Sequence, residues 1–160
     1  MIYVVCGTQK FPLNRLLKAL DELVENGKIK ERIVAQIGHS DYYPKHYEWV
    51  KFNDSAEFEK NIRECSLLLT HSGVGTILAG KENNKPILVF PRSKKYGEHV
   101  DDHQWQIARM FAEKNYVLIC ESVEELEEKI ELCKSFSFRE LIPKENVLVD
   151  VISEYLKENL

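Results

Sequence analysis

Short apolar segments alternate with segments of helical periodicity along nearly the whole chain. The apolar segments predict strands at Ile2–Cys6, Arg32–Ile37, Tyr47–Phe52, Leu67–Thr70, Pro86–Phe90 and Val117–Cys120. Apolar residues at helical spacing predict helices at Asn14–Asn26, after Asp54, up to about Glu82, from Asp101 or Asp102 to about Lys114, at Ser122–Leu132 and at Val147–Leu160. This alternation predicts an α/β fold, with a mostly parallel sheet and helices on both faces.

Three polar loops follow predicted strands. They span Gly7–Lys10, His71–Thr76 and Pro91–Gln104. Ligands of such sheets bind beyond the carboxyl ends of the strands, where the direction of the strand order reverses. We therefore expect the three loops to share one rim of the sheet and to carry the binding site.

The composition narrows the class of protein. The 160 residues are the size of one domain, and 22 basic against 26 acidic residues give a net charge of −4. A mildly acidic chain without a basic block argues against nucleic-acid binding. No apolar run approaches the roughly 20 residues of a membrane span, and no signal peptide is recognisable, so a cytoplasmic location is expected. The four cysteines are widely spaced in apolar segments, which predicts buried free thiols rather than a zinc site.

The segment Ser72–Thr76 carries the clearest chemical signal. Gly73 and Gly75 lie between a predicted strand and a predicted helix, where backbone N–H groups can face an anion. Ser72 and Thr76 add hydroxyl donors. The segment is interpreted as a phosphate or diphosphate site, the alternative being that the glycines only form a tight turn.

Two known phosphate-binding patterns nearly match this segment and fail. Leu78 stands where the dinucleotide fingerprint has Gly or Ala, and Glu82 stands where the P-loop has the Ser or Thr that holds Mg²⁺. The sequence therefore argues against NAD binding and against ATP hydrolysis of the P-loop type.

The densest polar cluster runs from Glu98 to Gln104. His99 and His103 are four residues apart, which makes a metal site conceivable, but no third ligand is evident. Asp101 followed by Gln104 also resembles a capping box, which would explain both residues without a ligand. The basic residues just before the cluster, at 92, 94 and 95, are consistent with a solvated loop or with attraction to an anion.

These motifs together resemble the C-terminal domain of family 28 glycosyltransferases. The residues that carry the resemblance are Val5–Gln9, Asn14–Leu16, Thr70–Thr76, Pro91–Arg92, Gly97–His99 and Asp102–Gln104, in the family's order and within Met1 to about Cys120. The chain is most similar to the small PssE-type subunits of bacterial exopolysaccharide and capsule synthesis. It is also similar to the catalytic subunit of the split eukaryotic N-acetylglucosaminyltransferase and to the donor half of MurG.

The resemblance implies that residues 1–160 form one Rossmann-like domain, the donor-binding half of a GT-B enzyme. Such a half would bind a UDP-sugar without metal or other cofactor and transfer the hexosyl group with inversion. A separate membrane-anchored, PssD-like subunit would bind the lipid-linked saccharide acceptor and bring this chain to the inner face of the membrane. The expected donor is UDP-galactose, with UDP-N-acetylglucosamine next. The alternatives are a non-catalytic enhancer subunit that binds nucleotide sugars, and a flavodoxin-type protein, which the absence of a flavin signature disfavours.

The resemblance also assigns roles to individual residues. It implies nucleotide-sugar contacts from Gly7, Thr8, Gln9, Ser72, Gly73, Val74, Gly75, Thr76, Asp102, His103 and Gln104. Candidates for the general base are His71, Glu98 and His99, and the partner is an equal source of that group. Ala79 stands where MurG has a glutamate for the ribose hydroxyls, so ribose recognition must come from elsewhere, Glu98 and backbone groups being the suggestions. A predicted helix over about 146–160 either covers the chain's own sheet or docks on the partner.

Overall fold

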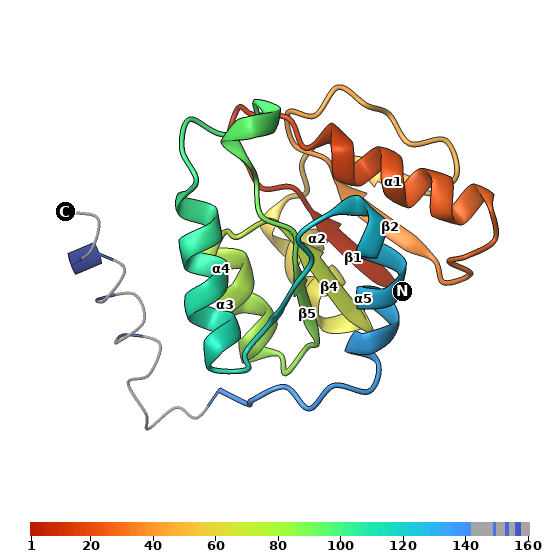
Figure 1. The fold of residues 1–160 in the computed structure, drawn as a ribbon. Coiled ribbons are helices and arrows are strands. Elements are labelled where there is room, and N and C mark those ends of the chain that lie inside the picture. Colours follow the sequence, from red (N-terminus) through yellow and green to blue (C-terminus); the bar gives the residue numbers. More distant parts are fainter. Residues whose placement is uncertain (142–148, 150–152, 154–155, 158–160) are drawn as a thin grey trace.

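A parallel six-stranded sheet forms the centre of the computed structural model, which describes residues 1–141, 149, 153, 156 and 157 (Figure 1). Its strands are β1 (Ile2–Val5), β2 (Ile33–Gln36), β3 (Glu48–Val50), β4 (Leu67–Thr70), β5 (Ile87–Val89) and β6 (Leu118–Ile119). They lie in the order β3-β2-β1-β4-β5-β6, and each neighbouring pair is parallel. The predicted α/β fold is confirmed.

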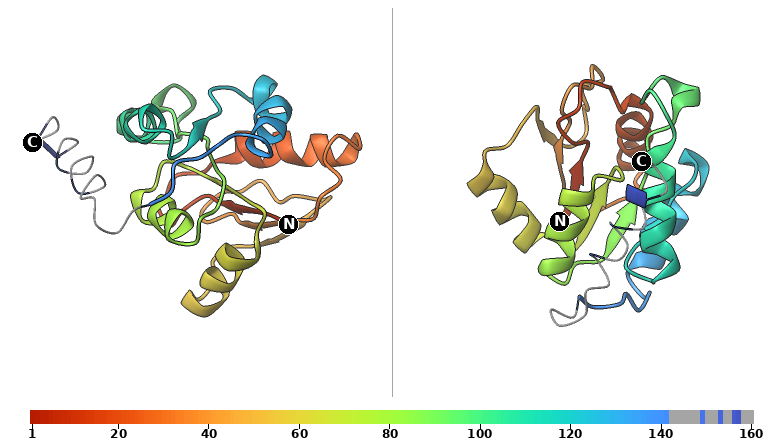
Figure 2. Two further views of the ribbon diagram at one scale, coloured as in Figure 1. Left: turned by 90° about the horizontal axis from the view of Figure 1, so that it is seen from below. Right: turned by 90° about the vertical axis from the view of Figure 1, so that its left-hand side faces the viewer.

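Helices cover both faces of the sheet. They are α1 (Asn14–Glu25), α2 (Ser55–Glu64), α3 (Val74–Glu82), α4 (His103–Glu113) and α5 (Leu126–Cys133), with short 3-10 turns η1 (Lys94–Tyr96) and η2 (Val123–Glu125). Residues of α1 and α5 share one buried cluster, and residues of α2, α3 and α4 share the other. Figure 2 shows α1 and α5 on one side of the sheet, opposite α2 and α3.

Local sequence signals account for the positions of several helix ends. The side chain of Asp54, the residue after which the sequence predicts a helix, caps α2 by accepting a hydrogen bond from the backbone N–H of Glu57 at 2.8 Å. The capping box predicted for Asp101 and Gln104 is wrong. Asp101 instead accepts from the N–H of His103 at 3.0 Å, and the side chain of Gln104 turns away from the start of α4.

The structure also bears on the predictions for the cysteines, for membrane spans and for the last helix. The four cysteines are buried free thiols, as predicted. None of the described helices has the length and apolar character needed to cross a bilayer. The helix predicted over about 146–160 lies, apart from residues 149, 153, 156 and 157, outside the described residues.

The direction in which successive strands are added to the sheet reverses between β1 and β4. From β1 the chain builds outward through β2 and β3, and it then returns through α2 to β4 on the other side of β1. Val5 pairs with Gln36 on one side and with Thr70 on the other, so the segments that follow these strands meet at one edge. This is the position at which open parallel sheets bind their ligands.

Candidate functional site

A pocket of about 710 Å³ opens at this switch point, between α2 and α3. It lies over the carboxyl ends of β1 and β4. Its wall consists of Val5, Gly7, Thr8, Gln9, Gln36, Asn53, Asp54, Ser55, Phe58, Glu59, Ile62, Arg63, His71, Gly73, Gly75, Thr76, Ala79, Glu82 and Asn83. The loop after β1 and the glycine loop after β4 are therefore brought together, as the sequence predicts.

The amino-terminal end of α3 forms the anion-suited part of the pocket. Gly73 occupies the N-cap position, and no side chain caps the helix. The first N–H groups of a helix have no partner within it and carry a partial positive charge. Gly75 faces open space, because a Cβ there would meet no atom within 4 Å, and Thr76 adds a hydroxyl. A phosphate could reach the backbone at this point.

The ring of His71 lies between two glycines that belong to different loops. A Cβ on Gly7 would lie 2.4 Å from Nε2 of this ring, and a Cβ on Gly73 would lie 2.6 Å from Cε1. Gly7 also has a φ of +78°, which other residues rarely adopt. The packing of the histidine therefore requires glycine at positions 7 and 73. Gly75 does not contact the ring, and a side chain there would point into solvent.

The opposite wall comes from α2 and from the outer turns of α3. It includes Asn53, just before α2, with Phe58, Glu59 and Arg63 of α2 and Glu82 at the end of α3. The ring of Phe58 is half-buried and meets that of Tyr3 edge-on, with centroids 6.0 Å apart. These residues were not expected at the site, because polar residues on amphipathic helices usually face solvent. Carboxylates and amides in this wall suit sugar or ribose hydroxyls better than phosphate.

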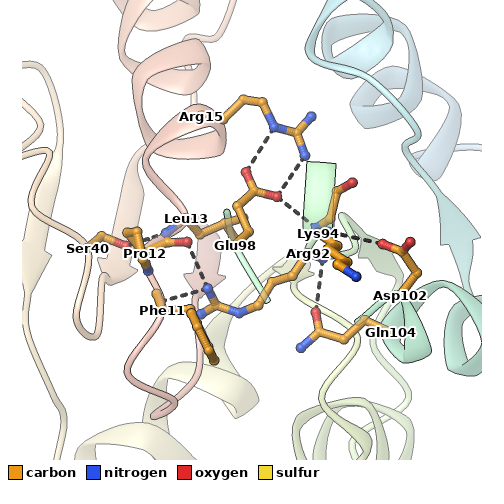
Figure 3. A network of polar contacts seen from close by, with 11 residues as sticks. Phe11, Pro12, Leu13, Arg15, Ser40, Arg92, Lys94, Glu98, Asp102 and Gln104 are labelled. Atoms are coloured by element: carbon orange, nitrogen blue, oxygen red, sulfur yellow. Dashed lines mark hydrogen bonds and ion pairs between the residues drawn. The ribbon is translucent and has the colours of Figure 1, made fainter. Parts of the chain in front are cut away.

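Arg92 joins the loop after β5 to the loop after β1. Its guanidinium donates hydrogen bonds to the carbonyl oxygens of Phe11 at 2.7 Å and of Pro12 at 2.9 Å (Figure 3). It also donates to the carbonyl oxygen of Cys6. These carbonyls stand on both sides of the loop Gly7–Lys10, and Arg92 is only 1% exposed. The basic residue at 92 is thus a buried structural clamp, and not part of a solvated loop.

Glu98 and Gln104 are also committed to contacts inside the protein. The carboxylate of Glu98 accepts two hydrogen bonds from Arg15, at 2.9 and 3.0 Å, and one from the backbone N–H of Ser93. The side chain of Gln104 accepts from the backbone N–H of Arg92 at 3.0 Å, and its Nε2 lies 3.3 Å from Nδ1 of His71. Together with the Arg92 clamp, these contacts place all three predicted loops on one rim.

The rings of the other two histidines considered as site residues face a single carboxylate outside the pocket wall. Nδ1 of His99 and Nδ1 of His103 lie 3.1 and 3.2 Å from the oxygens of Asp101. Two neighbouring residues interact with this carboxylate through three groups: the N–H of His103 has the largest effect, followed by the rings of His103 and His99. They hold the pKa of Asp101 below its usual value although its partial burial acts in the opposite direction. Among the described residues, no group of three potential metal ligands gathers.

The predicted contact residues therefore divide into two sets. Gly7, Thr8, Gln9, His71, Gly73, Gly75 and Thr76 line the pocket. The second set lies outside its wall: Ser72, Val74, Glu98, His99, Asp102, His103 and Gln104. Ser72 is buried, and its Oγ has no hydrogen-bond partner among the described residues. Asp102 accepts from the backbone N–H of Lys94 at 3.0 Å.

The strand order and the pocket at the switch point define a Rossmann-like domain with an anion-suited site. The chain belongs to the glycosyltransferase family 28 C-terminal domain family, whose sequence profile matches residues 1–148. Over 83 residues it is 34% identical to the UDP-N-acetylglucosamine transferase subunit ALG13 of Candida albicans, and over 76 residues 36% identical to that of Saccharomyces cerevisiae. The matched segments cover 52% and 47% of this chain, but only 27% and 36% of those proteins.

Solved structures share the fold at low sequence identity. An NMR structure of ALG13 superposes with a TM-score of 0.61 at 18% identity, covering 94% of this chain and 93% of that one. MurG from Acinetobacter baumannii superposes with a TM-score of 0.59 at 17% identity, covering 98% of this chain and 49% of MurG. The fold is thus that of a domain of GT-B glycosyltransferases.

Proposed function

We propose that this chain is the donor-binding subunit of a glycosyltransferase and that the pocket between α2 and α3 holds a UDP-sugar. The observation that carries the proposal is the two-ended character of the pocket. One end has the uncapped start of α3 with Gly75 open to solvent, and the other has carboxylates, amides and a half-buried phenyl ring. A diphosphate fits the first end, and a nucleoside with its hydroxyls fits the second.

The same arrangement suits the departure of UDP. As the bond between sugar and diphosphate breaks, negative charge grows on the phosphate oxygen. Helix amides and the Thr76 hydroxyl, already oriented by the fold, would stabilise that charge. We propose that this stabilisation replaces a metal ion, and that an acceptor hydroxyl attacks the anomeric carbon with inversion.

The ribose has candidate partners in the pocket wall. Ala79, which replaces the family's ribose-binding glutamate, does line the pocket. Glu82 lines it three residues further along α3, and Glu59 faces it from α2. Glu98 lies outside the wall and is already paired with Arg15. We therefore propose Glu82 as the acceptor for ribose hydroxyls.

The sugar is proposed from the relatives. They are named UDP-N-acetylglucosamine transferase subunits, which favours UDP-N-acetylglucosamine as the first donor to test over the UDP-galactose expected from the resemblance. None of the three residues expected as the base, His71, Glu98 and His99, is both inside the pocket and able to accept a proton near neutral pH. Burial and the charge of Arg92 lower the pKa of His71 to about 3, and Glu98 and His99 lie outside the wall. We propose that a partner subunit supplies the base, binds a lipid-linked acceptor, and brings this chain to a membrane.

Isothermal titration of the full chain tests the proposal. UDP, UDP-N-acetylglucosamine, UDP-galactose and ADP would each be titrated with Mg²⁺ and with EDTA. Binding of the UDP compounds, weaker binding of ADP, and no effect of EDTA are expected. Absence of UDP binding, or preference for ADP, would contradict the donor site.

A non-catalytic enhancer is the second candidate, favoured because none of His71, Glu98 and His99 is placed in the pocket as a usable base. Both candidates bind nucleotide sugar, so binding does not separate them. Sugar transfer by this chain with its partner, lost when Thr76 is replaced by a bulky residue, supports the donor subunit. Transfer that survives this substitution supports the enhancer.

A further inference from the structure

The histidine beneath the pocket has one engaged ring nitrogen and one unpartnered nitrogen. His71 follows β4, lines the pocket and keeps only 6% of its surface exposed. Its Nδ1 lies 3.3 Å from Nε2 of Gln104. Its Nε2 makes no hydrogen bond to any of the described residues. This nitrogen lies close to both glycine loops, as a Cβ on Gly7 or Gly73 would come within 2.4 or 2.7 Å of it.

The backbone of Arg92 determines the orientation of the Gln104 amide. The N–H of Arg92 can only donate, so the atom of Gln104 that lies 3.0 Å from it must be the oxygen. The amide NH₂ of Gln104 then faces Nδ1 of His71 and can only donate to it. A neutral imidazole that accepts at Nδ1 carries its proton on Nε2.

The surroundings keep this ring neutral. Burial, and then the positive charge of Arg92, lower the pKa of His71 to about 3. A protonated ring would also direct an Nδ1–H at the NH₂ group of Gln104, where two donors would meet. Near neutral pH the ring therefore presents an Nε2–H group between the two glycine loops.

We infer that Gln104 is a positioning residue that sets the tautomer of His71, so that the pocket receives a neutral N–H donor beside the start of α3. The inference rests on the proposed function in one respect, the identity of the anion that accepts from this donor. Gln104 acts through the ring and has no ligand contact of its own in this scheme. His71 then serves as a donor to a phosphate oxygen and not as the base.

The tautomer is read directly by long-range ¹H–¹⁵N correlation of the full chain labelled with ¹⁵N-histidine. The chain has five histidines, and His71→Phe assigns the signal of His71. The expected result is a neutral ring protonated at Nε2. A ring protonated at Nδ1, or an imidazolium at pH 7, would overturn the inference without reference to any ligand.

The substitution Gln104→Glu then tests the role of the amide. A carboxylate can still accept from the N–H of Arg92, but it presents an oxygen to Nδ1 and so draws a proton there. The ring is expected to become protonated at Nδ1, and UDP affinity is expected to fall by about 10- to 100-fold, as for the loss of a hydrogen bond to a charged group. Gln106→Glu introduces the same charge on the exposed side of α4 and is the control.

The outcomes separate this inference from the proposed function. An unchanged tautomer in a folded Gln104→Glu variant would overturn the inference. If the variant does not fold, the wild-type tautomer and the response of its Nε2–H signal to inorganic pyrophosphate decide, and a silent signal counts against the inference. Failure of the wild type to bind UDP would overturn the proposed function while the ligand-free tautomer result stands.

Discussion

The carboxylate of Glu98 and the guanidinium of Arg15 form a bidentate ion pair across 83 positions of sequence, with N–O distances of 2.9 and 3.0 Å. The rings of Phe90 and Tyr96 flank the guanidinium, with centroids 4.5 and 4.1 Å away. The Glu98 side chain is only 4% exposed. The pair connects the start of α1 to the loop after β5. Glu98 also accepts a hydrogen bond from the backbone N–H of Ser93, the residue next to Arg92.

Glu98→Gln is expected to lower the free energy of unfolding by about 2–4 kcal/mol, because it leaves the guanidinium of Arg15 without its counter-charge in a mostly buried place. Chemical denaturation measures the change. Glu48→Gln is the matched control, because its pair with Arg32 has the same geometry but is more than 60% exposed on both sides, and no measurable change is expected there. Equal losses in both variants would refute a special role for the Arg15–Glu98 pair.

Arg92→Lys is expected to loosen the loop Gly7–Lys10. A lysine ammonium cannot reach the three carbonyls that the planar guanidinium holds together, so some of these buried acceptors lose their partner. Amide hydrogen exchange over residues 7–13 should become faster by about 10-fold or more, as expected for the loss of at least one hydrogen bond. Arg109→Lys, on the exposed side of α4, should leave this exchange unchanged.

Gly75→Ala and Gly73→Ala are expected to act on different properties. A Cβ on Gly75 meets no atom within 4 Å, so helix propensity should raise stability by about 0.5–1 kcal/mol while the new methyl group obstructs the pocket. A Cβ on Gly73 would lie 2.6 Å from the ring of His71, which should lower stability by about 1–3 kcal/mol. Thermal unfolding measures the change in stability, and titration with UDP measures the change in affinity. A Gly75→Ala variant with unchanged UDP affinity would argue against close approach of phosphate to this backbone.

Acidification is expected to destabilise the protein from about pH 6.5 downward. His71 in the unfolded chain takes up a proton near its usual pKa of 6.5, whereas in the folded protein burial and Arg92 lower its pKa to about 3. Between these values the unfolded state binds more protons, so the stabilising contribution of the neutral ring is complete above pH 6.5. It is lost at up to about 1.4 kcal/mol per pH unit as the pH falls. Urea unfolding at pH 7, 6, 5 and 4 measures the slope, and His71→Phe should reduce it.

A second acid-sensitive group acts at lower pH. Asp21 is buried, which would raise its pKa. The N–H groups of Lys45 and His46 and the hydroxyl of Tyr42 donate to its carboxylate, and they lower the pKa below 3.8 overall. The ionised Asp21 carboxylate therefore stabilises the folded protein fully above pH 3.8, and this stabilisation is lost only as the pH falls below that value. A slope between pH 6.5 and 4 that persists in His71→Phe would show that another group carries it.

Glu82→Gln is expected to weaken UDP binding by about 10-fold, the effect of losing one hydrogen bond from a charged acceptor, while leaving binding of inorganic pyrophosphate unchanged. The difference between the two ligands isolates the ribose and base from the diphosphate. Glu64→Gln removes the same charge outside the pocket wall and is the control. Equal weakening for both ligands would mean that Glu82 acts through general electrostatics and not on the ribose.

Local pattern was sufficient to predict the fold and half of the pocket. The alternation of apolar strands with amphipathic helices requires a parallel sheet covered on both faces. The loop at Gly7–Lys10 and the segment His71–Thr76 follow directly after two short, mostly apolar segments that predict strands. Their meeting at one edge follows from parallel order alone, and the structure confirms it.

Only the tertiary structure decided which polar side chains face the pocket. Arg92, Glu98 and Gln104 form a polar cluster in sequence, but each of them also contacts a residue 33 to 86 positions away, and these contacts bury all three side chains in the protein. The residues of α2 that form the opposite wall have the pattern of an ordinary solvent-facing surface. A polar residue satisfies its hydrogen bonds equally well with water, a ligand or a distant residue, and nothing local distinguishes these partners until the chain has folded.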